Sequence, residues 1–224
     1  RGLTYWEEDG EGRLFYTMEM SLYAINAKTG RLVETFGNDG IVDLGENLDA
    51  GDALVSVSAT TPGVIFEDLY ILGMRTGESF GSSPGHIRAW DARTGEFRWI
   101  FHTIPEEGEF GYDTWEWVEG ETYGGANPWG GLTVDEARGW VFAGVGSPTY
   151  DFYGANRHGK NLFGNCVLAL DARTGERIWH YQTTHHDIWD MDNPPSPILI
   201  TISQDGYERD VVVQLTKQGF IFVL

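Results

Sequence analysis

The chain has 224 residues with 15 basic and 34 acidic side chains, which gives a formal net charge of −19. This charge, with no cluster of basic residues, argues against a nucleic-acid or anionic-membrane partner. Hydrophobic residues make up 41% of the chain, enough to bury a core, and no apolar run approaches the roughly 18 residues of a membrane-spanning helix. No signal-peptide pattern opens the sequence. Its single cysteine, Cys166, excludes an internal disulfide framework and a thiolate zinc cluster.

Short apolar or alternating runs follow one another along the chain. They are rich in Val, Ile, Leu, Phe and Tyr and are bounded by Gly, Asn, Asp or Pro, which is typical of β-strands. In chain order, the predicted strands are 13–18, 21–26, 64–72, 86–91, 140–145, 167–171, 197–202, 211–215 and 220–224. No run of about 10–12 residues has an apolar face with helical spacing. The sequence therefore predicts an all-β fold.

A short repeat occurs three times, at residues 23–31 (YAINAKTGR), 88–96 (RAWDARTGE) and 168–176 (LALDARTGE). Each copy predicts two strands joined by a tight turn, in which Asp or Asn bonds the turn backbone and glycine supplies a positive φ. The second and third copies continue to a tryptophan ten residues after their alanine, whereas Glu34 takes that place in the first copy. Repeated hairpins separated by long loops are best explained as blades of a β-propeller.

The pattern Ala-x-Asp-x-x-Thr-Gly-x-x-x-Trp resembles the tryptophan-docking motif of the eight-bladed quinoprotein dehydrogenases, which use pyrroloquinoline quinone (PQQ). The resemblance implies that Trp99 and Trp179 each pack on the next blade and that the junction at Glu34 is weaker or packed differently. Three repeats imply roughly three to four of eight blades. We therefore expect residues 1–224 to form one partial β-propeller domain, a central fragment incomplete at both ends. The remaining blades, or other copies of the chain, would be needed to close the ring.

The densest cluster of chemically versatile side chains lies at residues 183–197 (TTHHDIWDMDNPPSP). If this segment is extended, Asp190 and Asp192 point the same way, which suits a hard cation or a base held beside one. From the residue types alone, turn-capping aspartates and a strand-ending proline run explain the segment slightly better. The resemblance reverses that order, because it implies that Asp190 is the catalytic aspartate.

Two further segments carry candidate cofactor-binding residues. Lys217 lies in 216–222 (TKQGFIF) and, taken alone, would be a solvated turn residue; the resemblance implies a lysine that hydrogen-bonds the quinone oxygens. A cation there would also keep Asp190 ionised. Trp129 lies in the glycine-rich segment 124–132 (GGANPWGGL), where a packed tryptophan is common. Its flat face suits a planar ring, and the resemblance implies that it forms the floor under the quinone.

The resemblance also implies a metal site. Glu78 resembles a calcium-ligating glutamate, although an isolated glutamate in a polar loop is equally well explained by exposure to solvent. Ser147 stands where alcohol-oxidising relatives have a calcium-ligating asparagine, so its ligand would be a hydroxyl or carbonyl oxygen. With Asp190 and Asp192, these residues form the candidate metal-ligand set. Calcium is the default ion, and a lanthanide or Mg²⁺ stays an open alternative.

Three more residues are candidate cofactor contacts by resemblance: Arg1, Thr60 and Arg75. An arginine such as Arg1 suits bidentate binding of a cofactor carboxylate. The family resemblance further implies an exported, periplasmic protein.

The first hypothesis is therefore an oxidoreductase acting on CH–OH groups, a PQQ-dependent dehydrogenase of a sugar or alcohol. In the implied mechanism, bound Ca²⁺ polarises the quinone, Asp190 takes the substrate hydroxyl proton, and a hydride passes to the quinone. Lys217 stabilises the developing charge. Electrons leave to ubiquinone or a cytochrome c. We do not expect the isolated chain to be active.

Two alternatives stay open. The same docking repeats occur in non-catalytic propellers that act as scaffolds or binding modules in outer-membrane assembly. A degenerate quinoprotein that has lost metal binding is the other alternative, suggested by Ser147. A scaffold has no reason to place Asp190, Lys217, Trp129 and Glu78 at family spacings, so these four residues favour the enzyme.

Overall fold

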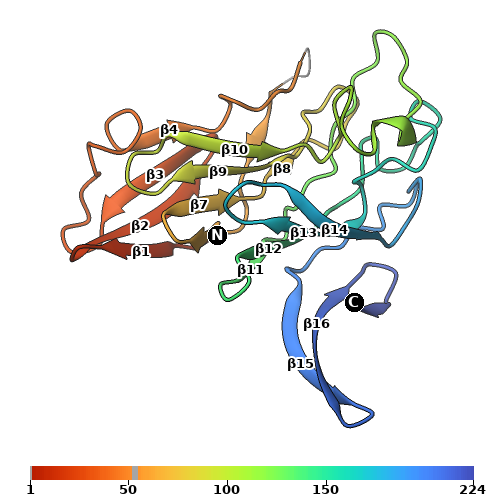
Figure 1. Ribbon diagram of the computed structural model, residues 1–224. Coiled ribbons are helices and arrows are strands. Elements are labelled where there is room, and N and C mark those ends of the chain that lie inside the picture. The colour runs from red at the N-terminus through yellow and green to blue at the C-terminus, as the bar shows by residue number, and fades with distance from the viewer. Residues whose placement is uncertain (1, 52–54) are drawn as a thin grey trace.

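The computed structural model describes residues 2–51 and 55–224, in which almost all regular structure is β (Figure 1). The first antiparallel sheet consists of β1 (Thr4–Glu8), β2 (Glu11–Met18), β3 (Ser21–Asn26) and β4 (Ile41–Asp43). The second consists of β6 (Val64–Phe66), β7 (Leu69–Leu72), β9 (Ile87–Asp91) and β10 (Phe97–Phe101). The third consists of β11 (Leu132–Asp135), β12 (Trp140–Gly144), β13 (Cys166–Asp171) and β14 (Arg177–Gln182).

The remaining two sheets have fewer strands. A last sheet contains β15 (Ile198–Gln204), β16 (Tyr207–Leu215) and β17 (Ile221–Val223), and a two-stranded sheet pairs β5 (Val57–Ser58) with β8 (Arg75–Thr76). Within the described residues, the helical structure consists of one 3₁₀ turn, Tyr112–Thr114. Nothing helical in 2–51 and 55–224 has the length and apolar character needed to cross a membrane. The predicted all-β class is confirmed.

One predicted strand is wrong. The run 64–72 forms the hairpin of β6 and β7, in which Phe66 pairs with Leu69, and not one continuous strand. Glu67 lies in the turn with a φ of 53°, a left-handed conformation that reverses the chain. The apolar residues on both sides hide this turn in the sequence. Strand β1, whose sequence is TYWEE, also has no apolar run that predicts it.

The repeated turns form as predicted. Asn26, Asp91 and Asp171 each accept hydrogen bonds from two backbone N–H groups of their own turn, at 2.8–3.1 Å. The turn glycines Gly30 and Gly95 have φ values of 68° and 74°, and the third has 76°. A side-chain oxygen that satisfies two backbone donors stabilises the turn, so the three hairpins share one local mechanism.

The junctions between sheets differ in the way the repeats predict. The Trp99 indole N–H donates to the Ala172 carbonyl at 3.2 Å. The ring packs closely on Gly175, because a Cβ atom added to that glycine would lie 2.5 Å from the indole. The second sheet therefore docks on the turn of the third. At the preceding junction Glu34 is exposed, and the Gly37 N–H donates to the Thr94 carbonyl at 2.7 Å. Backbone contact thus replaces the docked tryptophan there.

Each pair of neighbouring sheets shares an apolar core. Phe15 and Leu22 of the first sheet pack with Tyr70 and Trp90 of the second, all at most 1% exposed. A larger cluster joins the second and third sheets, and includes Ile71, Ala89, Val141, Leu168 and Leu170. The cluster between the third and last sheets is smaller: its buried members are Phe142, Val167, Ala169 and Val212. The first three sheets therefore have the larger hydrophobic contacts.

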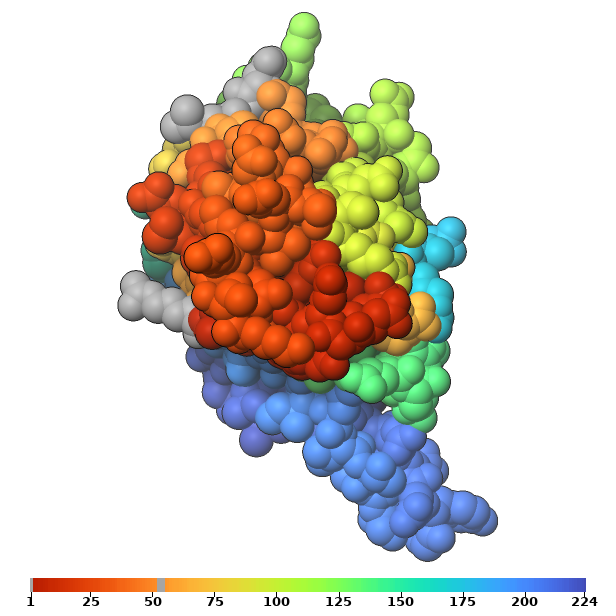
Figure 2. Space-filling view, turned by 90° about the vertical axis from the view of Figure 1, so that its left-hand side faces the viewer, coloured from red at the N-terminus to blue at the C-terminus, as the bar shows by residue number. Residues whose placement is uncertain are grey.

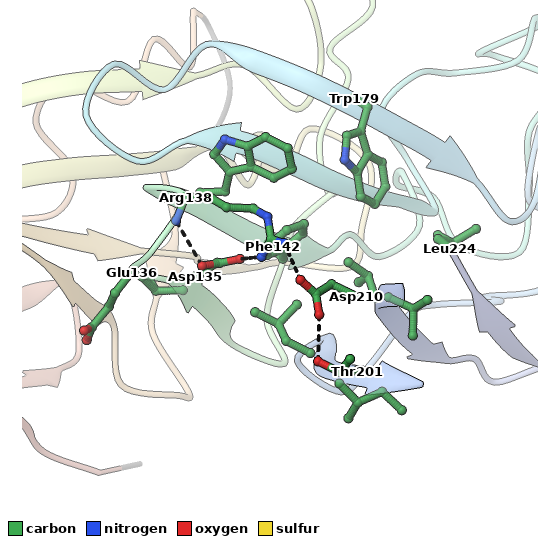
Figure 3. Close-up of a pocket in the computed structure, with 14 residues that line it drawn as sticks. Asp135, Glu136, Arg138, Phe142, Trp179, Thr201, Asp210 and Leu224 are labelled. Atoms are coloured by element: carbon green, nitrogen blue, oxygen red, sulfur yellow. Dashed lines mark hydrogen bonds and ion pairs between the residues drawn. The ribbon is translucent and has the colours of Figure 1, made fainter. Parts of the chain in front are cut away.

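The β15–β16 hairpin projects from the body of the molecule (Figures 1 and 2). Between the last sheet and the third lies a groove of about 570 Å³, toward which Trp179 points together with Phe142 (Figure 3). Arg138 bridges the two sheets across this groove, because it binds Asp135 at 2.6 Å and also Asp210. Trp179 therefore faces the next sheet along the chain, as a docking tryptophan does.

Candidate active site

A cavity of about 280 Å³ brings together side chains from loops that are far apart in the sequence. Arg75 of β8 and Glu78 of the loop after it line one part of this cavity. Trp129 comes from the loop before β11, and Ser147 from the loop after β12. Asp190 and Asp192 precede the β15–β16 hairpin, and Lys217 follows it. The structure thus groups seven of the nine predicted site residues around one cavity.

An ion-paired set lies in this cavity. Lys217 Nζ donates to Asp190 Oδ2 at 2.7 Å and to Asp192 Oδ2 at 2.8 Å. The Asp192 side chain is 8% exposed, whereas those of Asp190 and Lys217 are 28% and 35% exposed. The backbone of Asp190 is left-handed, with a φ of 55°. The lysine is therefore held from two sides, and one of its partners stays within reach of solvent and ligand.

Trp129 is held at both ends. Its indole Nε1–H donates to Asp192 Oδ2 at 3.2 Å, and its carbonyl accepts a hydrogen bond from the Thr60 hydroxyl at 3.0 Å. The next residue, Gly130, packs so closely on the segment that follows Asp192 that a Cβ on it would be 1.4 Å from the Pro194 carbonyl oxygen. Only glycine allows this approach, which brings Trp129 against the aspartate loop.

Burial and charge shift the acid–base properties of the set. Burial raises the pKa of Asp190 above its ordinary value; the hydrogen bond from Lys217 opposes this shift and the Asp192 charge reinforces it. Burial lowers the pKa of Lys217, but its bonds to Asp190 and Asp192 outweigh that effect and raise it overall. Lys217 therefore stays positively charged near neutral pH, and Asp190 is a stronger proton acceptor than an ordinary aspartate.

Asp151 is a cavity residue that no sequence pattern indicated. It is 8% exposed, and burial raises its pKa to about 7, with further upward contributions from the charges of Asp190, Asp192 and Glu78 and a downward one from Lys217. Asn127 and Thr149 also line the cavity unpredicted.

Replacing Asp151 with asparagine should change how stability depends on pH. Its carboxyl titrates at about 7 in the folded protein and at about 3.9 in an unfolded chain. The folded state therefore binds the extra proton between these values, and stability falls as pH rises from about 4 to about 7. In metal- and quinone-free protein, Asp151→Asn should be more stable than wild type by about 1–2 kcal/mol at pH 8. This value is smaller than the free energy that corresponds to the whole pKa shift, because water reaches the cavity and screens the charge.

Urea unfolding of both proteins at pH 8 and pH 5 measures this effect. The difference should shrink toward pH 5, where the wild-type carboxyl is mostly protonated. An equal difference at both pH values would contradict the assigned titration.

The other predicted residues have less central positions. Thr60 binds the Trp129 backbone and is not among the residues that line the cavity. Arg75 and Glu78 pair with each other at 3.7 Å, with side chains 53% and 74% exposed. Arg1 lies outside the described residues. Ser147 is buried. Its backbone N–H donates to Asp192 Oδ1 at 2.7 Å, and its hydroxyl donates to Asp187 Oδ2.

The predicted metal ligands bring oxygen atoms to the cavity, but their carboxylates are not gathered around one point where an ion could bind. Within 2–51 and 55–224, no group of three or more His, Cys, Asp or Glu side chains is arranged to hold a metal ion. Both carboxylate oxygens of Asp192 are engaged by protein donors. The metal-binding roles of Glu78, Ser147, Asp190 and Asp192 stay predictions.

The comparison with known families decides the relationship. The profile described as PQQ: Glucose/ethanol/alcohol dehydrogenase, beta-propeller domain, matches residues 1–224. The chain belongs to this family. The family assignment confirms the predicted resemblance, and with it the β-propeller of the quinoprotein dehydrogenase type, of which this chain contributes three four-stranded sheets and one three-stranded sheet.

Several family relatives match over nearly the whole chain. Quinoprotein glucose dehydrogenase of Escherichia coli (strain K12) is 34% identical over 91% of this chain and 25% of its own length. The dehydrogenase subunit of alcohol dehydrogenase (quinone) from Gluconacetobacter polyoxogenes is 30% identical over 100% of this chain and 31% of its own. The crystal structure of quinohemoprotein alcohol dehydrogenase from Comamonas testosteroni is similar with a TM-score of 0.83, at 28% identity, over 100% of this chain and 33% of that one. The chain thus spans a quarter to a third of these relatives.

Proposed function

We propose that the protein carrying this chain is a PQQ-dependent dehydrogenase that oxidises a hydroxyl group of a sugar or alcohol. The observation that supports this proposal is the set formed by Lys217, Asp190, Asp192 and Trp129, in which a cation, a base and an aromatic ring are hydrogen-bonded around one cavity. A non-catalytic scaffold would need no such grouping.

Three of the cavity residues, Trp129, Lys217 and Arg75, fit a planar, anionic quinone. Trp129 offers an aromatic ring fixed through its carbonyl and its indole N–H, and Lys217 and Arg75 offer positive charge. Trp129 and Lys217 would hold the quinone, with Thr60, Arg75 and Arg1 as further candidate contacts. When bound, the quinone would accept the two electrons that leave the substrate.

The donor chemistry also fits a hard cation. Glu78, Asp190 and Asp192 offer carboxylates and Ser147 offers a hydroxyl and a carbonyl, and oxygen atoms are the ligands that calcium prefers. We propose Ca²⁺ as the resident ion, which would supply Lewis-acid polarisation. A lanthanide is the alternative to be tested alongside it, with Mg²⁺.

In the proposed mechanism, Asp190 accepts the proton of the substrate hydroxyl as general base. Its left-handed turn and its bond to Lys217 fix the carboxylate, and its raised pKa strengthens it as an acceptor. Lys217 stays charged and stabilises negative charge that develops beside it. Asp192 keeps both Lys217 and Trp129 in place.

The cellular setting of this reaction is part of the proposal. By analogy with the family, we propose a periplasmic location and transfer of the electrons to ubiquinone or a cytochrome c. The substrate would be a small sugar or alcohol.

Reconstitution of the full-length protein tests the proposed function. Purified without quinone, it should bind PQQ in the presence of Ca²⁺ and then reduce a redox dye when glucose or ethanol is added. Parallel samples with a lanthanide, with Mg²⁺ and with no metal identify the ion. Absence of quinone binding under all four conditions would overturn the proposal in favour of a scaffold, and binding without turnover on any of a panel of sugars and alcohols would favour a degenerate quinoprotein.

A further inference from the structure

A buried aspartate lies directly behind the proposed base. Asp187 is 2% exposed, and its carboxylate accepts four hydrogen bonds. Two come from the chain around Asp190: the backbone N–H groups of Trp189, at 2.9 Å, and Met191, at 2.6 Å. The other two come from the Ser147 hydroxyl and the Asn165 amide, the latter at 2.9 Å. Oδ2 accepts three of these bonds and Oδ1 accepts the fourth, so both oxygens of the buried side chain have hydrogen-bond donors.

The two backbone bonds flank Asp190. Its left-handed φ of 55° is a conformation that non-glycine residues seldom adopt unless their surroundings hold them in it. The Asp187 carboxylate accepts hydrogen bonds from the backbone N–H of the residue before Asp190 and from that of the residue after it. The carboxylate therefore fixes the turn on which the proposed base is carried.

The same aspartate is anchored to the third sheet. Ser147 follows β12, and Asn165 immediately precedes β13. The Asp187 carbonyl in turn accepts a hydrogen bond from Arg157, a fully buried guanidinium that also binds the Asn161 side chain at 3.0 Å. Asp187 thus connects the loop of the proposed base to the third sheet.

We propose that Asp187 is the positioning residue of this site, whose buried carboxylate holds the Trp189–Met191 turn and thereby keeps Asp190 against Lys217. Its catalytic consequence rests on the proposed function, whereas its effect on Lys217 does not. Asp187 is not among the residues that line the cavity, so it acts through Asp190.

The test compares Asp187→Ala with Asp171→Ala in the full-length protein. Asp171 is the matched control, because it also accepts two backbone N–H groups of its own turn, at 2.8 and 3.1 Å, but lies away from the cavity. The first readout needs neither quinone nor substrate: the rate at which acetic anhydride acetylates Lys217, followed by mass spectrometry. Loss of the Asp190 partner should raise that rate about threefold to fivefold in Asp187→Ala and leave it unchanged in Asp171→Ala.

The second readout is steady-state kinetics of the reconstituted enzyme. Asp187→Ala should lower kcat by about 10- to 100-fold, because a displaced base works poorly, while KM and quinone affinity change little. Asp187→Asn keeps one acceptor oxygen and replaces the alanine variant if that variant does not fold. It should also raise the rate of Lys217 acetylation and lower kcat.

Unchanged Lys217 acetylation in a folded Asp187 variant would overturn the proposal, as would a loss of kcat no larger than in Asp171→Ala. Wild-type protein that binds no quinone would overturn the proposed function alone, because acetylation of Lys217 would still decide the role of Asp187.

Discussion

Asp190→Asn is expected to reduce turnover of the quinone-loaded, full-length enzyme by about a thousandfold, within the range typical for loss of a general base. Asparagine has nearly the same shape and tolerates a left-handed backbone, so the variant should fold. It cannot accept the substrate proton. Trp129 and Asp192 are unaltered, and quinone affinity should therefore change by less than about tenfold, which is under 1.4 kcal/mol. Dye-reduction kinetics and a quinone titration measure the two effects.

Asp205→Asn provides the matched control. Asp205 also has a φ of 55°, but it lies exposed in the turn of the β15–β16 hairpin, away from the cavity. The same substitution on the same backbone conformation should leave kcat and quinone binding at wild-type values. Turnover retained in Asp190→Asn would remove Asp190 as the base, and equal losses in both variants would point to a general effect on folding.

Gly130→Ala is expected to lower the free energy of unfolding by about 3 kcal/mol, near the upper end for overpacking of a folded structure. The added methyl group would lie 1.4 Å from the Pro194 carbonyl oxygen, a backbone atom that cannot rotate away. The loop of Trp129 must then separate from the loop of Asp192, which breaks the bond between the indole N–H and the carboxylate. Urea unfolding measures the stability, and tryptophan fluorescence reports the change around Trp129.

Gly206→Ala separates this collision from ordinary backbone strain. Gly206 has a φ of 81° with nothing within 4 Å of a Cβ, so alanine there meets only an unfavourable conformation. We expect a loss of about 1 kcal/mol and unaltered quinone binding. If Gly130→Ala were no more destabilising than Gly206→Ala, the close packing of the two loops would be refuted.

Much of the fold follows from local signals in the sequence. The Asp-x-x-Thr-Gly turns at Asp91 and Asp171 form because the aspartate, the two N–H groups and the glycine lie within five residues. The docking of Trp99 follows from its constant offset after such a turn. By contrast, the sequence does not predict the hairpin at Glu67, because Asp68 is the one turn-forming residue between two apolar runs and no glycine, asparagine or proline accompanies it.

The site is less visible in the sequence. Asp190, Lys217 and Trp129 were predicted through family motifs, and the structure places them together. Asp151 carries no such signal, and Asp187 lies within the predicted cluster at 183–197 but has no predicted role there. The environment of each is made by segments tens of residues away, such as the Glu78 loop for Asp151 and the start of β13 for Asp187. Burial and long-range partners of this kind arise only when the sheets pack.

The left-handed backbone at residue 190 limits which side chains can occupy that position. Among the residues that accept such a conformation readily are glycine, asparagine, aspartate and histidine, and of these only aspartate offers a carboxylate. Glutamate would bring the same charge, but with an extra methylene group and a less favourable backbone. Substitutions that preserve both the turn and a carboxylate are therefore scarce, and the left-handed backbone favours aspartate at this point.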